Sequence, residues 1–499
     1  MRLDLAVRTD VATRRAYDQH VQDSGGRGGP LTALTVLGFA TILMALGRDY
    51  APYWLVFAAA VAIQVGLCVT LWFITRTLLS ICTIVIASWL VYFTLRMVGI
   101  GLFTDPIYDH IAVSQASDEL RSEIWIGTTV VLLAFVLGMT LVRSWTAQRF
   151  ASESGPLMPG ILRVIALVGL AGYSLSSVLG LQSGILANAF QLYLFSVAAL
   201  SYGMARDRRI NPIDGIIVLL AVAIGPLSNF KEPAVIAILA VLVGYLASGA
   251  KVRPSLVVVS AIAALVAFST VQAQRIISEE TGTEASIVDV PSNVVASLTQ
   301  YDLAHGVAQE QNGLEVLANP FFGVLKRVQG ADALFALRAK IPDQVDYESG
   351  KSILQPVLAT IPAVDSLFDL EYNQLSLGRY YNYNFWSYRP DEDTSSQGIT
   401  VPGDLFLNWG WPGAVIGLGL MGGLLGWLDR RFPARSALGA GLFAYAFLPL
   451  LALERGVAYQ LVTLGIRLVI GLILVRALGG KWVREAEETP TNRSESVLA

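Results

Sequence analysis

The chain has 499 residues, of which 54% are hydrophobic and only 15% are charged, and its mean hydropathy is +0.57. Soluble domains carry about 25% charged residues, so this composition excludes a string of soluble domains. Apolar runs of about 17–25 residues recur along the chain, and each can cross a hydrocarbon core of roughly 30 Å. The net charge of −3 says little, because the charges are segregated. The sequence predicts an all-α polytopic membrane protein.

The first 30 residues form a polar segment that mixes arginines with aspartates and ends in a glycine-rich stretch. A signal peptide would continue directly into an apolar core, and this segment does not, so we expect a cytoplasmic tail over residues 1–30. Both cysteines, Cys68 and Cys82, fall inside apolar runs. This position excludes a disulfide framework in the aqueous parts of the chain.

About twelve transmembrane helices are predicted, nine within residues 31–273 and three within residues 404–478. A second polar tail, residues 479–499, follows them. The seventh span is short and ends near Gly225-Pro226, which makes it the weakest of the set. The predicted spans are 31–47, 53–75, 78–100, 124–142, 161–181, 185–204, 214–228, 233–249, 255–273, 404–428, 436–454 and 459–478.

Basic residues divide unevenly between alternate loops. With the N-terminal tail inside, cytoplasmic loops carry most of them, which agrees with the positive-inside rule and predicts that both termini are cytoplasmic. The inner loops hold Arg76, Arg143, Arg149, Arg206, Arg208, Arg209, Lys251, Arg253, Arg430, Arg431 and Arg435, whereas the short outer loops hold Arg48, Arg121, Lys231 and Arg455.

Residues 274–403 separate the ninth and tenth spans and lie outside in this topology. A structureless loop of that length is unusual, so we expect an external domain, periplasmic or extracellular. Its acidic residues outnumber its basic ones. Apolar periodicity predicts helices near 293–311, 313–328, 330–340 and 351–370.

Ionisable residues at the edge of a span are costly and therefore candidate functional residues. Arg96, Lys231, Arg275 and Arg455 are expected near the outer boundary, on different helices. Together they could bind one pyrophosphate, because arginine meets phosphate oxygens in bidentate fashion. The alternative is that these side chains snorkel to lipid phosphates. Arg467 is expected deeper in the last span, where structural pairing and a role in the site are both open.

Motifs for cofactors are absent from the sequence. The three histidines have no metal-ligand neighbours at helical spacing, which argues against a metal site. No Walker motif or dinucleotide fingerprint is found, and no basic, aromatic segment faces the cytoplasm. We therefore expect no cofactor and no nucleic-acid partner.

Aromatic residues crowd the end of the external loop. Tyr380, Tyr381 and Trp386 lie between Arg379 and Arg389. Aromatic faces stack on the apolar faces of sugar rings, and arginine binds hydroxyl groups, so these five residues are candidate glycan ligands. An aromatic core of the external domain, or an interfacial belt, would give the same pattern.

Three stretches carry a resemblance to a known family. The first runs Pro-Gly-Asp404-Leu-Phe-Leu-Asn408-Trp-Gly410-Trp-Pro-Gly413, after the long loop and before a glycine-rich span that ends in basic residues; it sets Asp404 at a helix start. The second is Ser228-Asn-Phe-Lys231-Glu232-Pro, and the third is Arg327-Val-Gln-Gly330-Ala-Asp332. In this order the chain resembles O-antigen and repeat-unit polymerases (Wzy-like) over roughly residues 215–432.

The resemblance implies a glycosyltransferase of the inner membrane. Such enzymes take undecaprenyl-pyrophosphate-linked oligosaccharides at the outer face and build O-antigen or exopolysaccharide, in the company of membrane lipids, a flippase and a chain-length regulator. Basic groups stabilise the leaving pyrophosphate, and a base deprotonates the acceptor hydroxyl. We expect Arg96, Lys231, Arg275 and Arg455 in the first role. The base is Glu232, Asp404 or Glu454, and Arg327 joins the glycan ligands.

Three alternatives remain open. An O-antigen ligase would share the architecture, but its His-Asn motif is missing, since Gly306 follows His305. A GT-C glycosyltransferase using polyprenyl-phosphate sugars would need an acid in the first outer loop, where Asp49 lies in a very short segment. A transporter of polysaccharide or lipid-linked glycan is the non-enzyme alternative, although the two halves show no internal symmetry.

Overall fold

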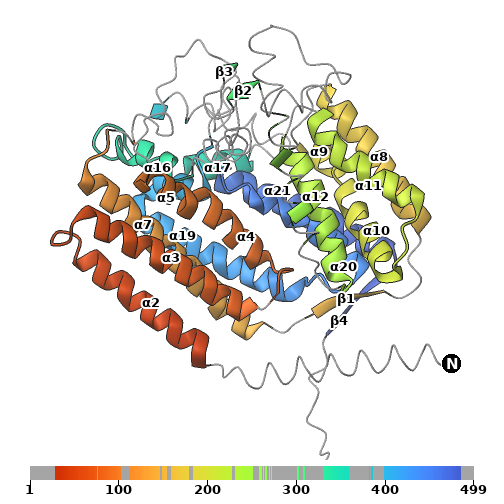
Figure 1. Ribbon diagram of the computed structural model, residues 1–499, viewed down its shortest axis with the longest axis horizontal. Helices are drawn as coiled ribbons and strands as arrows, with labels where there is room; N and C mark the ends of the chain where they lie inside the picture. The colour runs from red at the N-terminus through yellow and green to blue at the C-terminus, as the bar shows by residue number, and fades with distance from the viewer. Residues whose placement is uncertain are drawn as a thin grey trace, which may run out of the picture.

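The computed structural model is almost entirely helical in the residues it describes (Figure 1). These residues are 28–75, 77–102, 113, 115–146, 149–153, 159–178, 184–227, 231–250, scattered positions from 255 to 271, 300–302, 307–308, 330–358, 381, 384–385 and 398–484. Every structural statement below concerns this part of the chain.

A first group of helices packs around α19, on the left of Figure 1. Its most extensive contact joins α19 to α7, while α3 packs on α7 and α2 covers both from outside. The third span changes from α-helix to a π-helical segment, η1, and back. The members are α2 (Gly28–Leu46), α3 (Tyr53–Thr75), α4 (Ile81–Trp89), η1 (Leu90–Leu95), α5 (Arg96–Leu102), α7 (Asp118–Trp145) and α19 (Val401–Arg431).

Glycines let α7 and α19 approach backbone to backbone. A Cβ at Gly138 would lie 2.0 Å from the carbonyl oxygen of Gly419, and one at Gly422 would lie 2.2 Å from that of Phe135. Gly426, four residues beyond Gly422, meets the backbone of α7 as well. Small residues at this spacing are the usual means of close helix packing in membranes. The glycine-rich run of α19 is therefore a packing surface.

A second group of helices lies on the right of Figure 1 and packs around α10. The sequence predicts one span over 185–204, but the structure has two helices there, α9 and α10. The break lies at Gln191, whose side chain and that of Asn188 accept hydrogen bonds from Arg467. The members are α8 (Pro159–Val178), α9 (Gly184–Phe190), α10 (Tyr193–Asp207), α11 (Pro212–Leu227), α12 (Lys231–Ala247) and α20 (Ala437–Ala446).

The last two predicted spans connect the groups. After α20 the chain forms a short 3₁₀ helix, η4 (Leu448–Leu451), and then α21 (Val457–Ala477). Pro449, which lacks a backbone N–H, lies in η4 and ends the regular helix that was expected to continue to residue 454. η4 contacts both α4 and α12, and α21 contacts α9, α17 and α19. The turn between η4 and α21 therefore lies where the two groups meet.

Seven helices are long and apolar enough to cross a membrane, and three shorter apolar helices accompany them in the described residues. The seven correspond to the predicted spans 31–47, 53–75, 78–100, 124–142, 161–181, 404–428 and 459–478. The shorter three, Pro212–Ala223, Val235–Ala247 and Ala437–Ala446, overlap the predicted spans 214–228, 233–249 and 436–454. An all-α membrane protein is thus confirmed, while the count of twelve remains a prediction.

Two helices of the predicted external segment are described: α16 (Gly330–Arg338) and α17 (Lys351–Leu358). They lie at one end of the helix groups, called the α16 end below (Figure 1). The prediction of a helix over 293–311 is wrong at β2 (Tyr301–Asp302) and β3 (Val307–Ala308), which pair antiparallel. Tyr301 and Val307 have aromatic and β-branched side chains that favour strands.

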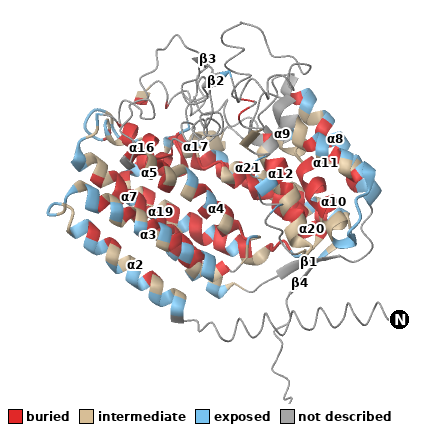
Figure 2. Cartoon of the chain, viewed as in Figure 1, coloured by how far each residue is buried: buried red, intermediate tan, exposed pale blue. Residues whose placement is uncertain are grey.

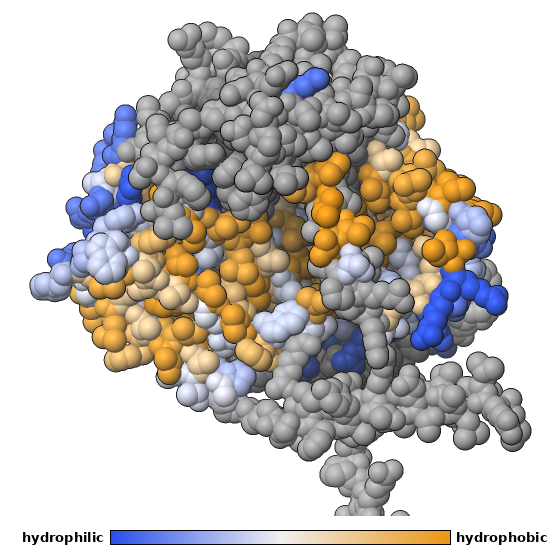
Figure 3. Space-filling model, in the orientation of Figure 1, coloured by the Kyte–Doolittle hydropathy of each residue, from blue (hydrophilic) through white to orange (hydrophobic). Residues whose placement is uncertain are grey.

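At the opposite end, β1 (Arg149–Glu153) pairs antiparallel with β4 (Gly480–Arg484). We call this end the strand end. Here the segment before α8 pairs with the segment after the last span. Buried residues gather on the facing sides of α7, α19, α10 and α20, whereas α2 is largely exposed (Figure 2). Apolar surface covers the sides of both groups between the two ends, as expected for a belt in contact with lipid (Figure 3).

Candidate functional site

Five of the predicted site residues are described with their side chains: Arg96, Tyr381, Asp404, Glu454 and Arg455. All five belong to segments that meet at the α16 end. Lys231 and Glu232 begin α12, and only their backbone is described. The predictions for Arg275, Arg327, Arg379, Tyr380, Trp386 and Arg389 fall outside the described residues.

Arg96, which follows the π-helical segment, forms a bidentate ion pair with Asp332 of α16. Its Nε lies 2.7 Å from Oδ2 and its Nη2 lies 2.9 Å from Oδ1. The Arg96 residue is 1% exposed and Asp332 is 0% exposed. Two buried charges are tolerated only when each satisfies the other, and the fork of the guanidinium does this for a carboxylate. The pair therefore attaches α16 to the third span.

Tyr381 packs against the same helix. Its hydroxyl donates a hydrogen bond of 3.2 Å to the carbonyl oxygen of Ala333, and its ring stacks on that of Phe385 at 5.8 Å between centroids. Burial, and then the negative charge of Asp332, raise the pKa of this hydroxyl well above its usual value. Tyr381 is 0% exposed, so here the aromatic segment contributes to the buried core at the α16 end.

Asp404, in the first turn of α19 as predicted, is 0% exposed and accepts hydrogen bonds on both carboxylate oxygens. Oδ1 accepts from the hydroxyl of Ser352 at 2.5 Å and from Nδ2 of Asn408 at 3.3 Å. Oδ2 accepts from the backbone N–H of Val457 at 2.8 Å. One carboxylate thus connects α17, α19 and α21.

The motif continues into a kink that receives the loop before α17. Trp409 and Gly410 leave helical geometry, and Gly410 has φ +65°. The kink frees the carbonyl oxygens of Leu407 and Asn408, which accept the N–H groups of Glu348 and Ser349. Asn408 also accepts the N–H of Gly350 on its side-chain oxygen at 2.7 Å and donates to Ser352 at 2.6 Å. The Asn-aromatic-Gly turn is a docking site for residues 348–352.

Glu454 and Arg455 form the turn between η4 and α21 and are both half-buried. The hydroxyl of Tyr92, in the π-helical segment, lies 3.4 Å from Oε2 of Glu454 and donates a hydrogen bond to it. The guanidinium of Arg455 lies 4.3 Å from the centre of the Tyr459 ring, a cation–π contact. A carboxylate and a guanidinium on adjacent residues are thus partly open to solvent where the two helix groups meet.

Tyr92 connects this turn to the Arg96 pair. It lies four residues before Arg96, and a Cβ added to Gly330 of α16 would be 2.6 Å from its carbonyl oxygen. Arg96, Asp332, Tyr92 and Glu454 therefore belong to one contiguous cluster. A π-helical turn inserts an extra residue and changes where side chains point, and such turns are frequent at functional sites.

A second charged cluster was not singled out from the sequence. Oε1 of Glu123, near the start of α7, accepts from Nε of Arg338 at 2.7 Å and from the indole of Trp411 at 2.9 Å. The hydrogen bond to Glu123 raises the pKa of Arg338. Glu123 lies at the predicted edge of a span, where an ionisable side chain is costly, and this position could have marked it as a candidate functional residue. Nothing in the sequence indicated that Arg338 was its partner.

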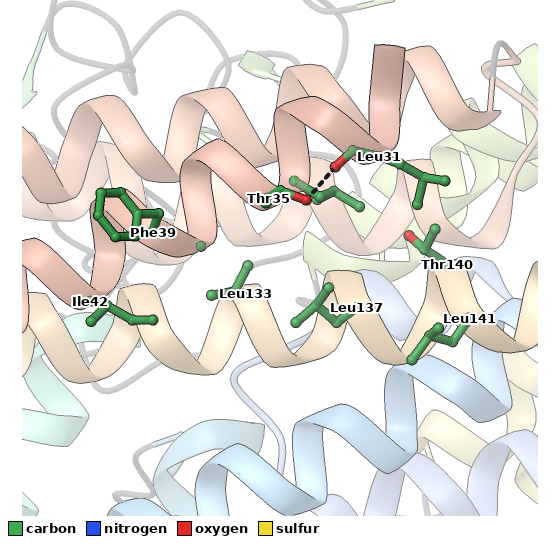
Figure 4. A pocket seen from close by; sticks show the side chains of 10 residues that line it. Leu31, Thr35, Phe39, Ile42, Leu133, Leu137, Thr140 and Leu141 are labelled. Carbon is green, nitrogen blue, oxygen red and sulfur yellow. Dashed lines mark hydrogen bonds between the residues drawn. The ribbon is translucent and has the colours of Figure 1, made fainter. Parts of the chain in front are cut away.

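A groove of about 430 Å³ opens between α2 and α7 (Figure 4). Leucines, Phe39 and Ile42 line it, with two threonines. The Thr35 hydroxyl donates to the carbonyl oxygen of Leu31, and the Thr140 hydroxyl donates to that of Val136. The groove presents hydrocarbon alone, which suits a lipid chain and does not suit an anionic head group. The cluster around Glu454 remains the candidate site.

The chemistry available in the candidate site is acid–base and electrostatic. A half-buried carboxylate can accept a proton, and an adjacent guanidinium can bind a phosphate oxygen. In the described residues no group of three or more His, Cys, Asp or Glu side chains could hold a metal ion. Comparisons with protein-family models, curated proteins and solved structures found no match to this chain.

Proposed function

We propose that the chain is a repeat-unit polymerase of surface polysaccharide synthesis, embedded in the inner membrane. It transfers a growing glycan from undecaprenyl pyrophosphate to the non-reducing end of a new lipid-linked unit. The resemblance described above suggests this reaction class, and the arrangement around Glu454 and Arg455 supports it.

The orientation follows from the distribution of charge between the two ends. The strand end carries a strong excess of basic residues, which favours the cytoplasm, so the α16 end is assigned to the outer face. The basic residues described at the strand end are Arg143, Arg149, Arg206, Arg208, Arg209, Arg430, Arg431, Arg435, Arg476, Lys481 and Arg484.

The observation that carries the proposal is the turn of Glu454 and Arg455, half-buried between the two helix groups at the α16 end. A lipid-linked substrate must keep its polyprenyl chain in the membrane and its pyrophosphate at the boundary. The turn suits such a boundary, since it directly precedes α21, which is long and apolar enough to cross a membrane. It offers one cation to the phosphate and one carboxylate to the sugar.

In the proposed reaction Glu454 accepts the proton of the acceptor hydroxyl. The oxygen forms a bond to the anomeric carbon of the growing glycan as the bond from that carbon to the pyrophosphate oxygen breaks. The electron pair of the broken bond leaves with undecaprenyl pyrophosphate, whose charge Arg455 stabilises. Lys231 and Arg275 are proposed as further phosphate ligands, and Arg327, Arg379, Tyr380, Trp386 and Arg389 as glycan ligands. Arg96 and Tyr381 are assigned to holding α16.

The proposal is tested with purified protein in liposomes, supplied with lipid-linked repeat units and no nucleotide. We expect a ladder of longer lipid-linked glycans. Glu454→Gln and Arg455→Met should slow formation of the ladder about 10²-fold or more, whereas Glu119→Gln and Lys351→Met, at exposed positions of the same end, should leave the rate unchanged. Transfer of glycan to a lipid A acceptor alone would indicate a ligase, and use of polyprenyl-phosphate sugars would indicate a GT-C enzyme. Movement of intact substrate across the bilayer without extension would indicate an exporter.

A further inference from the structure

Helix α21 begins without a capping side chain of its own. Its N-cap residue is Gly456, which has none to offer. The first N–H groups of a helix need an acceptor, normally a Ser, Thr, Asp or Asn at the N-cap. Here Oδ2 of Asp404, from a different helix, accepts the N–H of Val457 at 2.8 Å. Asp404 therefore caps α21 from α19.

The residues just before Asp404 bind the same turn through their backbone. The N–H of Thr400 donates to the carbonyl oxygen of Glu454, and the N–H of Val401 donates to that of Leu453, both at 3.0 Å. Gly398 lies so close that a Cβ there would be 2.6 Å from the Glu454 carbonyl oxygen. The start of α19 and the turn before α21 are thus held together by three hydrogen bonds, one of which is the cap from Asp404 to Val457.

The capping carboxylate is itself fixed in place. Ser352 and Asn408 both donate to Oδ1, and the side chains of all three residues are buried. Ser352 belongs to α17, which contacts α21 directly and lies above its start in Figure 1. The rotamer of Asp404 is therefore set by the external segment. Displacement of residues 348–352 would release the cap.

We infer that Asp404 is a positioning residue, which acts on the reaction through Val457 by fixing the turn that carries Glu454 and Arg455. This inference rests on the proposed function for its effect on the reaction, but its structural part does not. A carboxylate that is 0% exposed and accepts three hydrogen bonds is shaped to hold a turn. Its hydrogen bond from the N–H of Val457 connects it to the turn that carries the proposed reacting groups.

Hydrogen–deuterium exchange without substrate tests the structural part. In the wild-type protein the amides of residues 453–460 should be protected. Asp404→Ala should accelerate their exchange about tenfold or more, because the cap is lost. Ser352→Ala removes one hydrogen bond to Oδ1 of Asp404 and should give an intermediate acceleration. It replaces Asp404→Ala as the test variant if Asp404→Ala does not fold. The control Asp346→Asn alters an exposed carboxylate of the same segment and should leave exchange unchanged.

The extension assay then separates positioning from direct participation. Asp404→Asn should reduce the rate while the shape of its pH profile stays that of the wild type, since Asp404 transfers no proton. Unchanged exchange in Asp404→Ala or Ser352→Ala, combined with abolished extension, would overturn the inference and make Asp404 a reacting group. Unchanged exchange with normal extension would overturn it too. If the wild-type protein extends no glycan, the proposed function fails, and the exchange measurement still decides whether Asp404 caps α21.

Discussion

Arg96 and Asp332 are 236 positions apart in the sequence and form a bidentate pair that solvent does not reach. The pair attaches α16 to the third span beside Tyr92. Asp332 neutralises the charge of Arg96, which was expected to bind pyrophosphate. The α16 end of the third span consequently supports the candidate site, and the phosphate ligands proposed above are Lys231, Arg275 and Arg455.

Removing one member of this pair should destabilise the protein strongly. Arg96→Met or Asp332→Asn leaves a buried charge without its partner, which costs about 3–5 kcal/mol. Thermal unfolding in detergent measures the loss, and a double-mutant cycle isolates the coupling. The double variant should be far more stable than the sum of the single changes predicts. Strictly additive losses would contradict a direct pair, and Arg48→Met, which removes an ion pair to the exposed carboxylate of Glu119, is the control.

Close packing of α7 on α19 makes a second prediction. Gly422→Ala places a Cβ where the Phe135 carbonyl oxygen lies 2.2 Å away, so the helices must separate, at a cost of about 1–3 kcal/mol. Gly465→Ala adds the same atom in open space on α21 and should be neutral or slightly stabilising. Equal melting temperatures of the two variants would show that the α7–α19 contact is loose.

The sequence predicted the apolar helices well, because a hydrocarbon environment leaves few alternatives to a long apolar helix. It placed the end of α19 at Asp429-Arg430-Arg431 and Asp404 in the first turn, and both placements are confirmed. It could not predict that Asp404 would serve the helix that begins at Val457. Capping from another helix depends on how segments 53 residues apart pack, and a linear pattern carries no record of that.

The same reason explains Arg96. A lone arginine at a predicted membrane boundary is visible in the sequence, but the predicted external segment contains many acids, and no spacing marks Asp332 as the partner. The breaks at Gln191 and Pro449 were missed because apolar composition continues through them. Local hydropathy predicts where helices lie, whereas buried polar contacts decide where they bend.

Gly410 should tolerate no side chain. Its φ of +65° and ψ of −160° lie in a region that only glycine adopts readily, and a Cβ would lie 2.8 Å from the Tyr347 hydroxyl. We expect Gly410→Ala to cost about 1–3 kcal/mol and to release residues 348–352, seen as faster amide exchange there. Gly203→Ala, with open space around it, is the control. Adding Tyr347→Ala removes the steric contact but leaves the backbone strain, so the loss of stability that persists in the double variant measures the strain alone.

The hydrogen bond from Tyr92 to Glu454 gives the last prediction, which depends on the proposed base. Tyr92→Phe keeps the ring and its backbone contact with Gly330 but removes the donor 3.4 Å from the carboxylate. Because the bond orients the base, its loss should slow extension several-fold, whereas Glu454→Gln should slow it about 10²–10⁴-fold. In the Glu454→Gln background, Tyr92→Phe should have no further effect, and Tyr50→Phe, at a 92% exposed ring, should have none in either. An equal effect of Tyr92→Phe in both backgrounds would mean that Tyr92 acts independently of Glu454. That result would contradict the proposed role of Glu454 as the base.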